Sequence, residues 1–307
     1  SVAWGASVGG IGTPVGTPPN LIGLAAIRKA GFDLSFLEWM AIGVPLGLVM
    51  LGGMLLVLQK LLGVEDAPIA QPERRDTAWL PGEKSVLVAV VIAMTGWLGP
   101  TILDLAFPGA FVSYWLTQHL TEEVVALVAG TVLFVLPGGT RDRPRSRPAL
   151  TWIEAARIDW GVIFLFAGGI LLGDLAGKNG LSDQWGRALV EATGASSTWT
   201  ITALVTGIAI VLSELTSNTA TATLMAPLAG SLALAAGAAP VPAMLGATLG
   251  SSFGFMLPIS TGPNAMAYGT GRVTVRQMMQ AGIVFDVVGF ILIVAGLRLL
   301  CPILGLA

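Results

Sequence analysis

Two segments that lie far apart in the chain share an unusual run of Gly, Thr, Pro and Asn. Residues 6–20 read ASVGGIGTPVGTPPN, and residues 250–264 read GSSFGFMLPISTGPN. Both are embedded in apolar sequence without charged residues, and both contain too much Gly and Pro for a continuous helix. Backbone groups that a broken helix leaves unpaired cannot stay unsatisfied in hydrocarbon. Such a segment has to line a cavity or bind something, unless it is a kinked helix packed through its small residues.

The two segments form a weak internal repeat. When the first is shifted by 244 positions, six residues are identical: Ser7/Ser251, Gly10/Gly254, Pro14/Pro258, Thr17/Thr261, Pro19/Pro263 and Asn20/Asn264. Interrupted apolar segments at corresponding positions in two halves of a chain are typical of the binding site of a secondary transporter. The matched pair therefore favours a transport function over two kinked structural helices.

A third polar feature is the triplet Ser217-Asn218-Thr219, which lies between apolar runs at 199–213 and 222–236. Each run is shorter than the roughly 20 residues of a full membrane crossing. The pattern predicts a re-entrant hairpin with the triplet at its tip, although ordinary spans with back-bonded Ser and Thr would look similar. A helix that begins at the triplet presents N–H groups suited to a carboxylate. The carbonyls that end the preceding helix suit a small cation.

Charged side chains are missing from both Pro-Asn segments and from the triplet, and only Glu214 lies close by. An anion would therefore be held by amides, hydroxyls and a bound cation. Hydroxyls of Ser213, Thr216 and Ser260 add candidate oxygen ligands for that cation. Because the tip has no carboxylate, the pattern favours sodium coupling over proton coupling. Glu214 fits either a proton site or a hydrogen-bonded carboxylate that supports the hairpin.

The composition identifies the kind of protein that must hold these residues. Of 307 residues, 54% are hydrophobic and 11% are charged, whereas a soluble domain carries roughly 25% charged residues. These values exclude a soluble or disordered chain and predict an all-α polytopic membrane protein. The net charge of −2 argues against a nucleic-acid partner. With one cysteine (Cys301) and one histidine (His119), a disulfide framework, a Cys-cluster metal site and a Ser-His-Asp triad are not expected.

Stretches without charged residues mark the candidate spans. They are 1–27, 39–59, 85–103, 124–140, 160–173, 192–213 and 215–271, followed by 277–297, which only Asp286 interrupts. The stretch 215–271 contains five prolines and must consist of several pieces. Basic residues gather at 60–84 and 141–157, which predicts that these loops are cytoplasmic. The segment 150–160, with Trp152 and Trp160, suits a helix that lies along the membrane interface.

At these residues the sequence resembles the divalent anion/sodium symporter family, which includes the sodium-coupled dicarboxylate transporters. The resemblance rests on GTPPN at 16–20, WGVIFLFAGGILL at 160–172, SNTATA at 217–222 and FMLPISTGPN at 255–264, and it covers essentially the whole chain. It implies an all-α inverted-repeat transporter in which each half has a re-entrant hairpin and a broken helix. It also implies a homodimer, an elevator-like movement of the site, and Na⁺ as coupling ion without any cofactor.

The resemblance also assigns site residues. The positions that correspond to substrate-binding residues are Thr17, Ser217, Asn218, Thr219, Thr261 and Gly262. Gly16 flanks the first sodium site, and the second corresponds to Ser213, Thr216, Asn218 and Ser260. The second loop departs from the family, because Thr261-Gly262 stands where Thr-Pro is usual. This change is expected to alter the stiffness of the loop or the choice of substrate.

In terms of this family, residues 1–30 form the broken helix and loop of the first repeat, 31–63 its last helix, 64–83 a cytoplasmic linker, and 84–307 the second inverted repeat. The second repeat is expected to contain the hairpin at about 199–237 and the broken helix at about 241–270. Because only one Ser-Asn-Thr triplet occurs, we expect a C-terminal fragment of a longer protein whose first hairpin precedes Ser1. A truncated, inactive scaffold is the alternative.

The functional hypothesis is sodium-coupled import of small dianions, with C4-dicarboxylates such as succinate as substrates. The protein is then an integral membrane protein, located in the cytoplasmic membrane if it is bacterial, and not an enzyme. A sulfate-type oxyanion carrier and a dicarboxylate exchanger are alternatives within the same family. A more distant alternative is a membrane-embedded hydrolase that uses Asp174 and Asp286, two acids within apolar spans.

Overall fold

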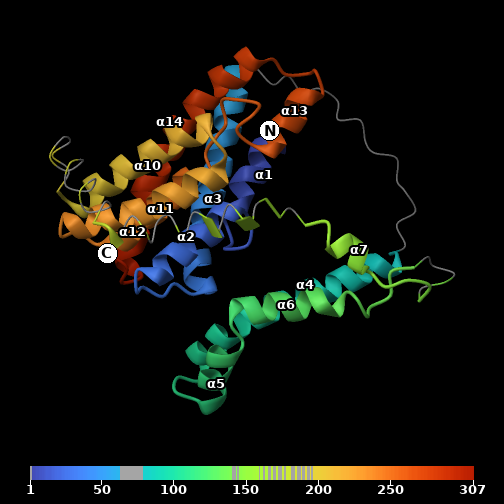
Figure 1. The fold of residues 1–307 in the computed structure, drawn as a ribbon. Coiled ribbons are helices and arrows are strands. Elements are labelled where there is room, and N and C mark those ends of the chain that lie inside the picture. Colours follow the sequence, from blue (N-terminus) through green and yellow to red (C-terminus); the bar gives the residue numbers. More distant parts are fainter. Residues whose placement is uncertain are drawn as a thin grey trace. The chain divides into compact units, whose positions relative to one another are not determined.

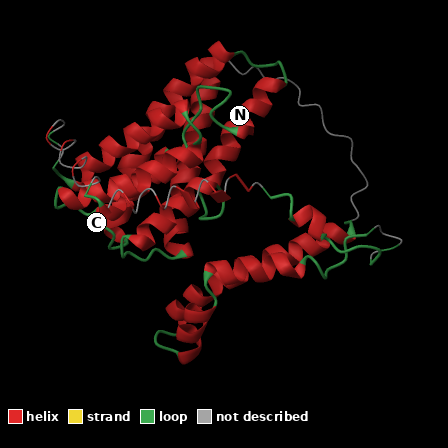
Figure 2. Ribbon diagram, viewed as in Figure 1, coloured by secondary structure: helices red, strands yellow, loops and turns green. Residues whose placement is uncertain are grey.

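The computed structural model describes the backbone continuously over residues 2–62, 79–139, 145–158 and 196–307, and only single residues or short pieces of the rest. The described parts are helical and contain no strand, which confirms the predicted all-α class (Figure 2). The helices, labelled in Figure 1, are α1 (Val2–Gly10), α2 (Pro18–Lys29), α3 (Phe36–Leu62), α4 (Pro81–Ala106), α5 (Phe111–His119), α6 (Glu122–Val132), α7 (Trp152–Ala155), α10 (Thr198–Leu215), α11 (Asn218–Ala235), α12 (Pro240–Gly250), α13 (Gly262–Gly269) and α14 (Val275–Ile303).

Four of the described helices, α3, α4, α10 and α14, are long and apolar enough to cross a membrane, with mean hydropathies between 1.6 and 2.5. The helices on either side of the Pro-Asn segments are much shorter. They have 9 and 12 residues in the first case and 11 and 8 in the second. At about 1.5 Å per residue, these helices are roughly 12–18 Å long, which is close to half of the roughly 30 Å hydrocarbon thickness. The chain thus combines helices of full-span length with paired half-spans, and α10, the first arm of the predicted re-entrant hairpin, has 18 residues and is the shortest of the four long helices.

Contacts divide the chain into two compact units. The smaller unit contains α4 to α7, and the larger contains α1, α2, most of α3 and α10 to α14. In the smaller unit α4 packs against α6. Trp97 Nε1 donates to the carbonyl of Glu122 (3.1 Å), and Ser85 Oγ donates to that of Pro137 (2.6 Å). These bonds tie α4 at two levels to the segment that contains α6.

The short helix α7 begins with a capping box. The hydroxyl and the N–H of Thr151 donate to the carboxylate of Glu154, and together with Arg147 they lower the pKa of Glu154 to about 2. The side chains of Trp152 and Ile153 are 75% and 69% exposed. An exposed Trp beside an exposed Ile is what a helix at the membrane interface presents to the lipid. The interfacial position predicted for 150–160 fits this arrangement.

Helix α12 lies at the centre of the larger unit, and all of its residues are buried. It packs against α2, α10, α11 and α14. These contacts depend on small residues, because a Cβ at Gly23 of α2 would overlap Thr248 of α12, and one at Gly246 would overlap Thr206 of α10. Membrane helices commonly pack closely through such positions. The neighbours therefore clamp α12 and fix where the loop after it begins.

An aromatic cluster anchors that loop. Phe253 and Phe255 of the loop pack against Phe285 of α14, and Trp4 of α1 joins them. The rings of Trp4 and Phe285 are stacked with centroids 5.2 Å apart. All four side chains are buried. The cluster therefore connects the two interrupted helices to α14.

The contact between Gly23 and Thr248 predicts a high cost for one added methyl group. Gly23→Ala places its Cβ within the space occupied by the Thr248 side chain, and overpacking of this kind typically costs about 1–3 kcal/mol. We expect a lower unfolding temperature in detergent. Gly52→Ala in α3 is the matched control, because its Cβ would have no neighbour within 4 Å. Equal unfolding temperatures for G23A and the unmodified protein would contradict the close α2–α12 contact.

Candidate functional site

The first Pro-Asn segment interrupts the helix between α1 and α2, with Thr17 in an extended conformation (φ −151°, ψ 146°). The side chain of Asn20 closes the loop, because its Nδ2 donates to the carbonyls of Gly10 (2.9 Å) and Thr13 (2.8 Å). Asn20 is fully buried, and a Cβ at Gly16 would overlap the carbonyl of Gly10. The amide thus supplies partners for carbonyls that the break removes from regular helix bonding.

The second segment, between α12 and α13, repeats this arrangement. Nδ2 of the fully buried Asn264 donates to the carbonyls of Gly254 (2.7 Å) and Leu257 (3.1 Å). Thr261 caps α13, and its Oγ1 accepts from the N–H of Asn264 (3.2 Å). The amide and both carbonyls lie 244 positions after their counterparts. The repeat of sequence is therefore also a repeat of hydrogen bonds, even where Leu257 replaces Thr13, because only the main chain of that residue takes part.

Helices α10 and α11 form a hairpin whose turn contains Thr216 and Ser217. Ser217 caps α11, and its Oγ accepts from the N–H of Ala220 (3.1 Å). Thr216 Oγ1 donates to the carbonyl of Leu212 (3.0 Å) and lies 2.8 Å from Thr221 Oγ1. The structure thus places a helix end and a helix start directly next to each other at the triplet.

Oxygen atoms gather where the hairpin tip meets the second loop. Ser213 Oγ lies 2.7 Å from Asn218 Oδ1 and 2.6 Å from the carbonyl oxygen of Ser251. A hydroxyl has one hydrogen, so it satisfies only one of these two acceptors. A Cβ at Gly254 would lie 3.1 Å from the carbonyl of Ser213 and 3.3 Å from Asn218 Oδ1, which places both oxygens against the loop. This excess of acceptors over hydrogens suits a small hard cation.

Glu214 also lies at this site, although the sequence did not place it among the residues that bind substrate or sodium. It is 2% exposed and accepts from the N–H groups of Met256 (2.7 Å) and Leu257 (3.2 Å) and from Ser260 Oγ (2.9 Å). Three donors compensate the burial of a carboxylate. Of the two interpretations given to Glu214 above, these bonds favour the supporting carboxylate. The available signal was its isolation, since it is the only charged residue between Glu191 and Arg272.

The structure brings together three of the residues predicted to bind sodium. Ser213 and Asn218 lie in the oxygen cluster, and Ser260 joins them through the buried glutamate. Thr216 directs its hydroxyl along the hairpin, whereas Gly16 lies in the first loop. The role of each of these residues stays a prediction.

The residues predicted to bind substrate lie at the beginnings of three helices, and none of these residues is buried. They are the N-cap residues Thr17 of α2, Ser217 of α11 and Thr261 of α13, with Asn218, Thr219 and Gly262 directly after the last two caps. None of the three first turns contains an acidic residue. Each helix start offers N–H groups without a partner in the helix, together with the positive end of the helix dipole.

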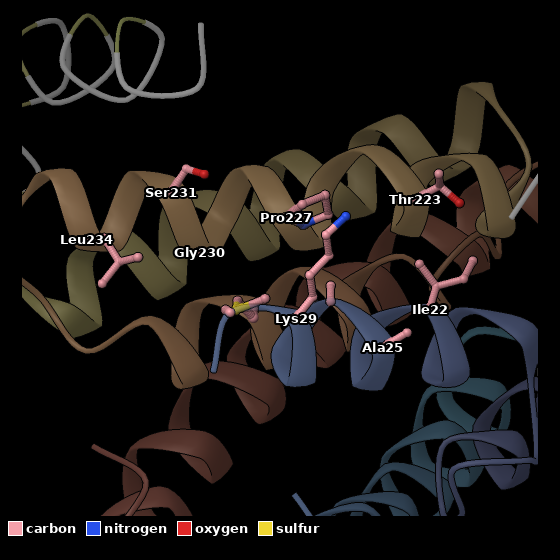
Figure 3. A pocket seen from close by; sticks show the side chains of 11 residues that line it. Ile22, Ala25, Lys29, Thr223, Pro227, Gly230, Ser231 and Leu234 are labelled. Atoms are coloured by element: carbon pink, nitrogen blue, oxygen red, sulfur yellow. The ribbon is translucent and has the colours of Figure 1, made fainter. Parts of the chain in front are cut away.

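Helices α2 and α11 lie side by side and run in the same direction. Figure 3 shows Ile22 beside Thr223 at one end of the pair, and Lys29 beside Pro227 farther along both helices. These residues line a cavity of about 280 Å³ between α2, α11 and α12. The N-caps of α2 and α11 therefore face the same side. Two positive helix ends on one side form a favourable environment for an anion.

The family described as "Sodium:sulfate symporter transmembrane region" matches residues 1–306. The chain belongs to this family. It is 29% identical to the sodium-dependent dicarboxylate transporter SdcS of Staphylococcus saprophyticus, a similarity that covers 98% of this chain and 58% of that protein. It is 28% identical to SdcS of Staphylococcus aureus (strain USA300), over 99% of this chain and 58% of the relative. The chain thus spans somewhat more than half the length of these relatives.

The family match confirms the resemblance inferred from the Pro-Asn segments and the triplet. Together with the four apolar helices, it identifies the chain as an integral membrane protein. Part of the motif at 160–172 that contributes to the resemblance lies outside the described residues. So does Asp174, whose pairing with Asp286 was the basis of the hydrolase alternative. Asp286 instead lies against Glu214.

The two asparagine amides predict a matched pair of destabilised variants. Asn20→Asp and Asn264→Asp each replace a double donor by an acceptor that faces two carbonyls. Each buried acceptor left without its bond costs about 1–3 kcal/mol, so we expect clearly lower unfolding temperatures in detergent for both variants. Asn179→Asp is the control, because Asn179 is exposed and bonds one carbonyl. A drop in only one of the two loops would contradict their equivalence.

Proposed function

We propose that this chain forms the larger part of a sodium-coupled secondary transporter for small divalent anions in the cytoplasmic membrane. C4-dicarboxylates such as succinate are the proposed substrates. The observation that carries the proposal is the grouping of helix starts at a hairpin tip that has no charged side chain. Sodium and dicarboxylate in the names of the relatives support it.

In this proposal the dianion is bound by backbone amides and hydroxyls. Residues 1–27 contain no charged residue, and residues 192–271 contain only Glu214. No arginine or lysine is therefore close in sequence to the three helix starts that face the ligand. The starts of α2 and α11 face one side, and the start of α13 follows a loop that Glu214 ties to the hairpin. Several helix starts give each end of a dicarboxylate its own N–H donors.

Asn218 couples the cation to the anion. Its Oδ1 belongs to the oxygen cluster with Ser213, while its main chain forms the first turn of α11, where the anion binds. A sodium ion in the cluster fixes this side chain and adds positive charge beside the anion. Binding of the anion is then stronger when sodium is present, and by linkage sodium binds more strongly by the same factor. This reciprocity is the thermodynamic basis of symport.

The contacts between the two interrupted helices support an inverted repeat. Helix α1 contacts α13, and α2 contacts α12, so the first half of each helix lies against the second half of the other. A two-fold axis between antiparallel copies produces such crosswise pairing. Because α2, α10, α11 and α14 clamp α12, we propose that these elements carry the site across the membrane as one body, in an elevator-type movement within a homodimer.

A second hairpin completes the first repeat in this proposal. The half-helix α12 is buried along its whole length, whereas its counterpart α1 has open space at Gly5 and Gly9. The relatives are also longer than this chain. We propose that the longer protein supplies a hairpin with a second Ser-Asn-Thr triplet, which packs on α1 as α10 and α11 pack on α12.

The test is uptake of radiolabelled succinate into proteoliposomes that contain the longer protein, with an inward sodium gradient or with potassium in its place. We expect uptake only with sodium. An excess of unlabelled sulfate separates the two substrate classes. Strong inhibition of succinate uptake by sulfate would indicate an oxyanion carrier and not a dicarboxylate carrier. Uptake that does not depend on sodium but requires succinate inside the liposomes would indicate exchange and not symport.

Ser213→Ala tests the oxygen cluster. The change removes the hydroxyl between Asn218 Oδ1 and the carbonyl of Ser251. We expect the sodium concentration for half-maximal uptake to rise about tenfold, which corresponds to about 1.4 kcal/mol, with a smaller effect at saturating sodium. Ser146→Ala is the control, since Ser146 is exposed in the smaller unit and bonds only the carbonyl of Arg143. An unchanged sodium dependence in S213A would exclude this serine from the sodium site.

A further inference from the structure

Two buried carboxyl groups face each other behind the hairpin tip. Asp286 of α14 is 6% exposed, Glu214 of α10 is 2% exposed, and their side chains interact directly. The oxygens of Glu214 receive three hydrogen bonds from the second loop. Neither oxygen of Asp286 receives a hydrogen bond from an N–H or hydroxyl donor among the described residues, and its polar neighbour is the carboxyl group of Glu214. A buried carboxylate without a hydrogen-bond donor or counter-ion is costly. A further group or ion therefore has to compensate the negative charge of Asp286 in the working protein.

The hairpin and the second loop beside this pair contain no basic residue, and α3, which also packs on α14, has its lysine, Lys60, seven residues beyond the Gly53 that lies next to Val288. Residues 196–271, which include α10 to α13, contain no Lys, Arg or His, and neither does α1. On α14 the nearest are Arg276 and Arg298, ten and twelve residues from Asp286, which places them about 15 and 18 Å away along the helix. The positive charge that two buried acids require is therefore not supplied by this part of the chain.

The position of Asp286 on α14 explains how the two acids meet. Gly282 and Gly289 lie four residues before and three after it, on the same face of the helix. A Cβ at Gly282 would lie 2.6 Å from the Cα of Met256, and one at Gly289 would overlap Phe253. The two glycines thus let the second loop lie directly on α14. Between them, Asp286 reaches the junction of loop and hairpin that Glu214 holds together.

We propose that Asp286 and Glu214 bind a sodium ion at a site separate from the oxygen cluster of Ser213 and Asn218. The inference rests on the proposed function, which makes sodium the available cation. Carboxylate oxygens without hydrogens are suitable ligands for a small hard cation. The free oxygens of Asp286 coordinate the ion, and its positive charge offsets the repulsion between the two acids. Because Glu214 also bonds Met256 and Ser260, the bound ion stabilises the junction between the hairpin and the second loop.

Sodium binding is measured on the purified protein in detergent, without substrate, as the unfolding temperature against NaCl with choline chloride keeping the ionic strength constant. A ligand that binds only the folded state raises this temperature with its concentration, and the slope against the logarithm of concentration reflects the number of ions bound. Asp286→Asn keeps the size of the side chain and removes its charge. We expect a smaller slope for D286N, and a further decrease when S213A is added.

The relative stability of D286N should change sign with sodium. Without sodium, the variant is at least as stable as the unmodified protein, because the uncompensated charge is gone. At high sodium, the unmodified protein is the more stable one. This crossing also excludes a simple folding defect, which would lower the stability of D286N at every sodium concentration. Asp33→Asn is the control, since Asp33 is 92% exposed in the same unit, and its slope should not change.

Two results would overturn the inference. The first is a slope for D286N equal to that of the unmodified protein. The second is a stability difference that depends on pH and not on sodium, which would show that the two acids share a proton. Either result leaves sodium-driven succinate uptake to be judged by the proteoliposome assay. Conversely, a normal sodium titration without any succinate uptake would refute the proposed transport and keep the ion site.

Discussion

The architecture depends on satisfying the backbone where two helices are interrupted. In each loop one asparagine donates both amide hydrogens to carbonyls, Asn20 to Gly10 and Thr13 and Asn264 to their counterparts. A neutral amide does this without placing a charge in an apolar environment, which a lysine or arginine would do. Because the carbonyl side of each break is satisfied internally, the N–H groups on its other side remain for a ligand. The broken helices can therefore be structurally stable and still open toward an anion.

The second loop is held from several directions, and this makes it one body with the hairpin. Asn264 bonds it from within, Glu214 bonds it from the hairpin, and the aromatic cluster fixes it against α1 and α14. Movement of the hairpin tip relative to this loop would break the three hydrogen bonds of a buried carboxylate. A conformational change that carries the site must therefore move hairpin and loop together. This is the mechanical requirement of the elevator-type movement proposed above.

The breaks and the tip of the hairpin were predictable because their signals are local. Proline and glycine interrupt a helix wherever they occur, and six identities located both loops. The contacts that build the site are not local. Glu214 and Met256 are 42 residues apart, and Glu214 and Asp286 are 72 apart. Apolar runs specify that a segment lies in the membrane, but not which face of it meets which loop. The sequence therefore shows that Glu214 is isolated from other charged residues, but it does not identify the residues that contact its side chain.

The two loops have the same pattern of internal hydrogen bonds but differ in the charge beside them. This difference affects the order in which sodium and the dianion bind. No charged residue occurs in residues 1–27, whereas the second loop has Glu214 and Asp286 behind it. Buried acids attract a cation and repel an anion in a medium of low dielectric constant. In the proposed transporter the ions of the second loop therefore bind before the dianion, and they remove the repulsion that it would otherwise meet. An empty second loop then disfavours the anion alone, so the charge distribution itself opposes uncoupled transport.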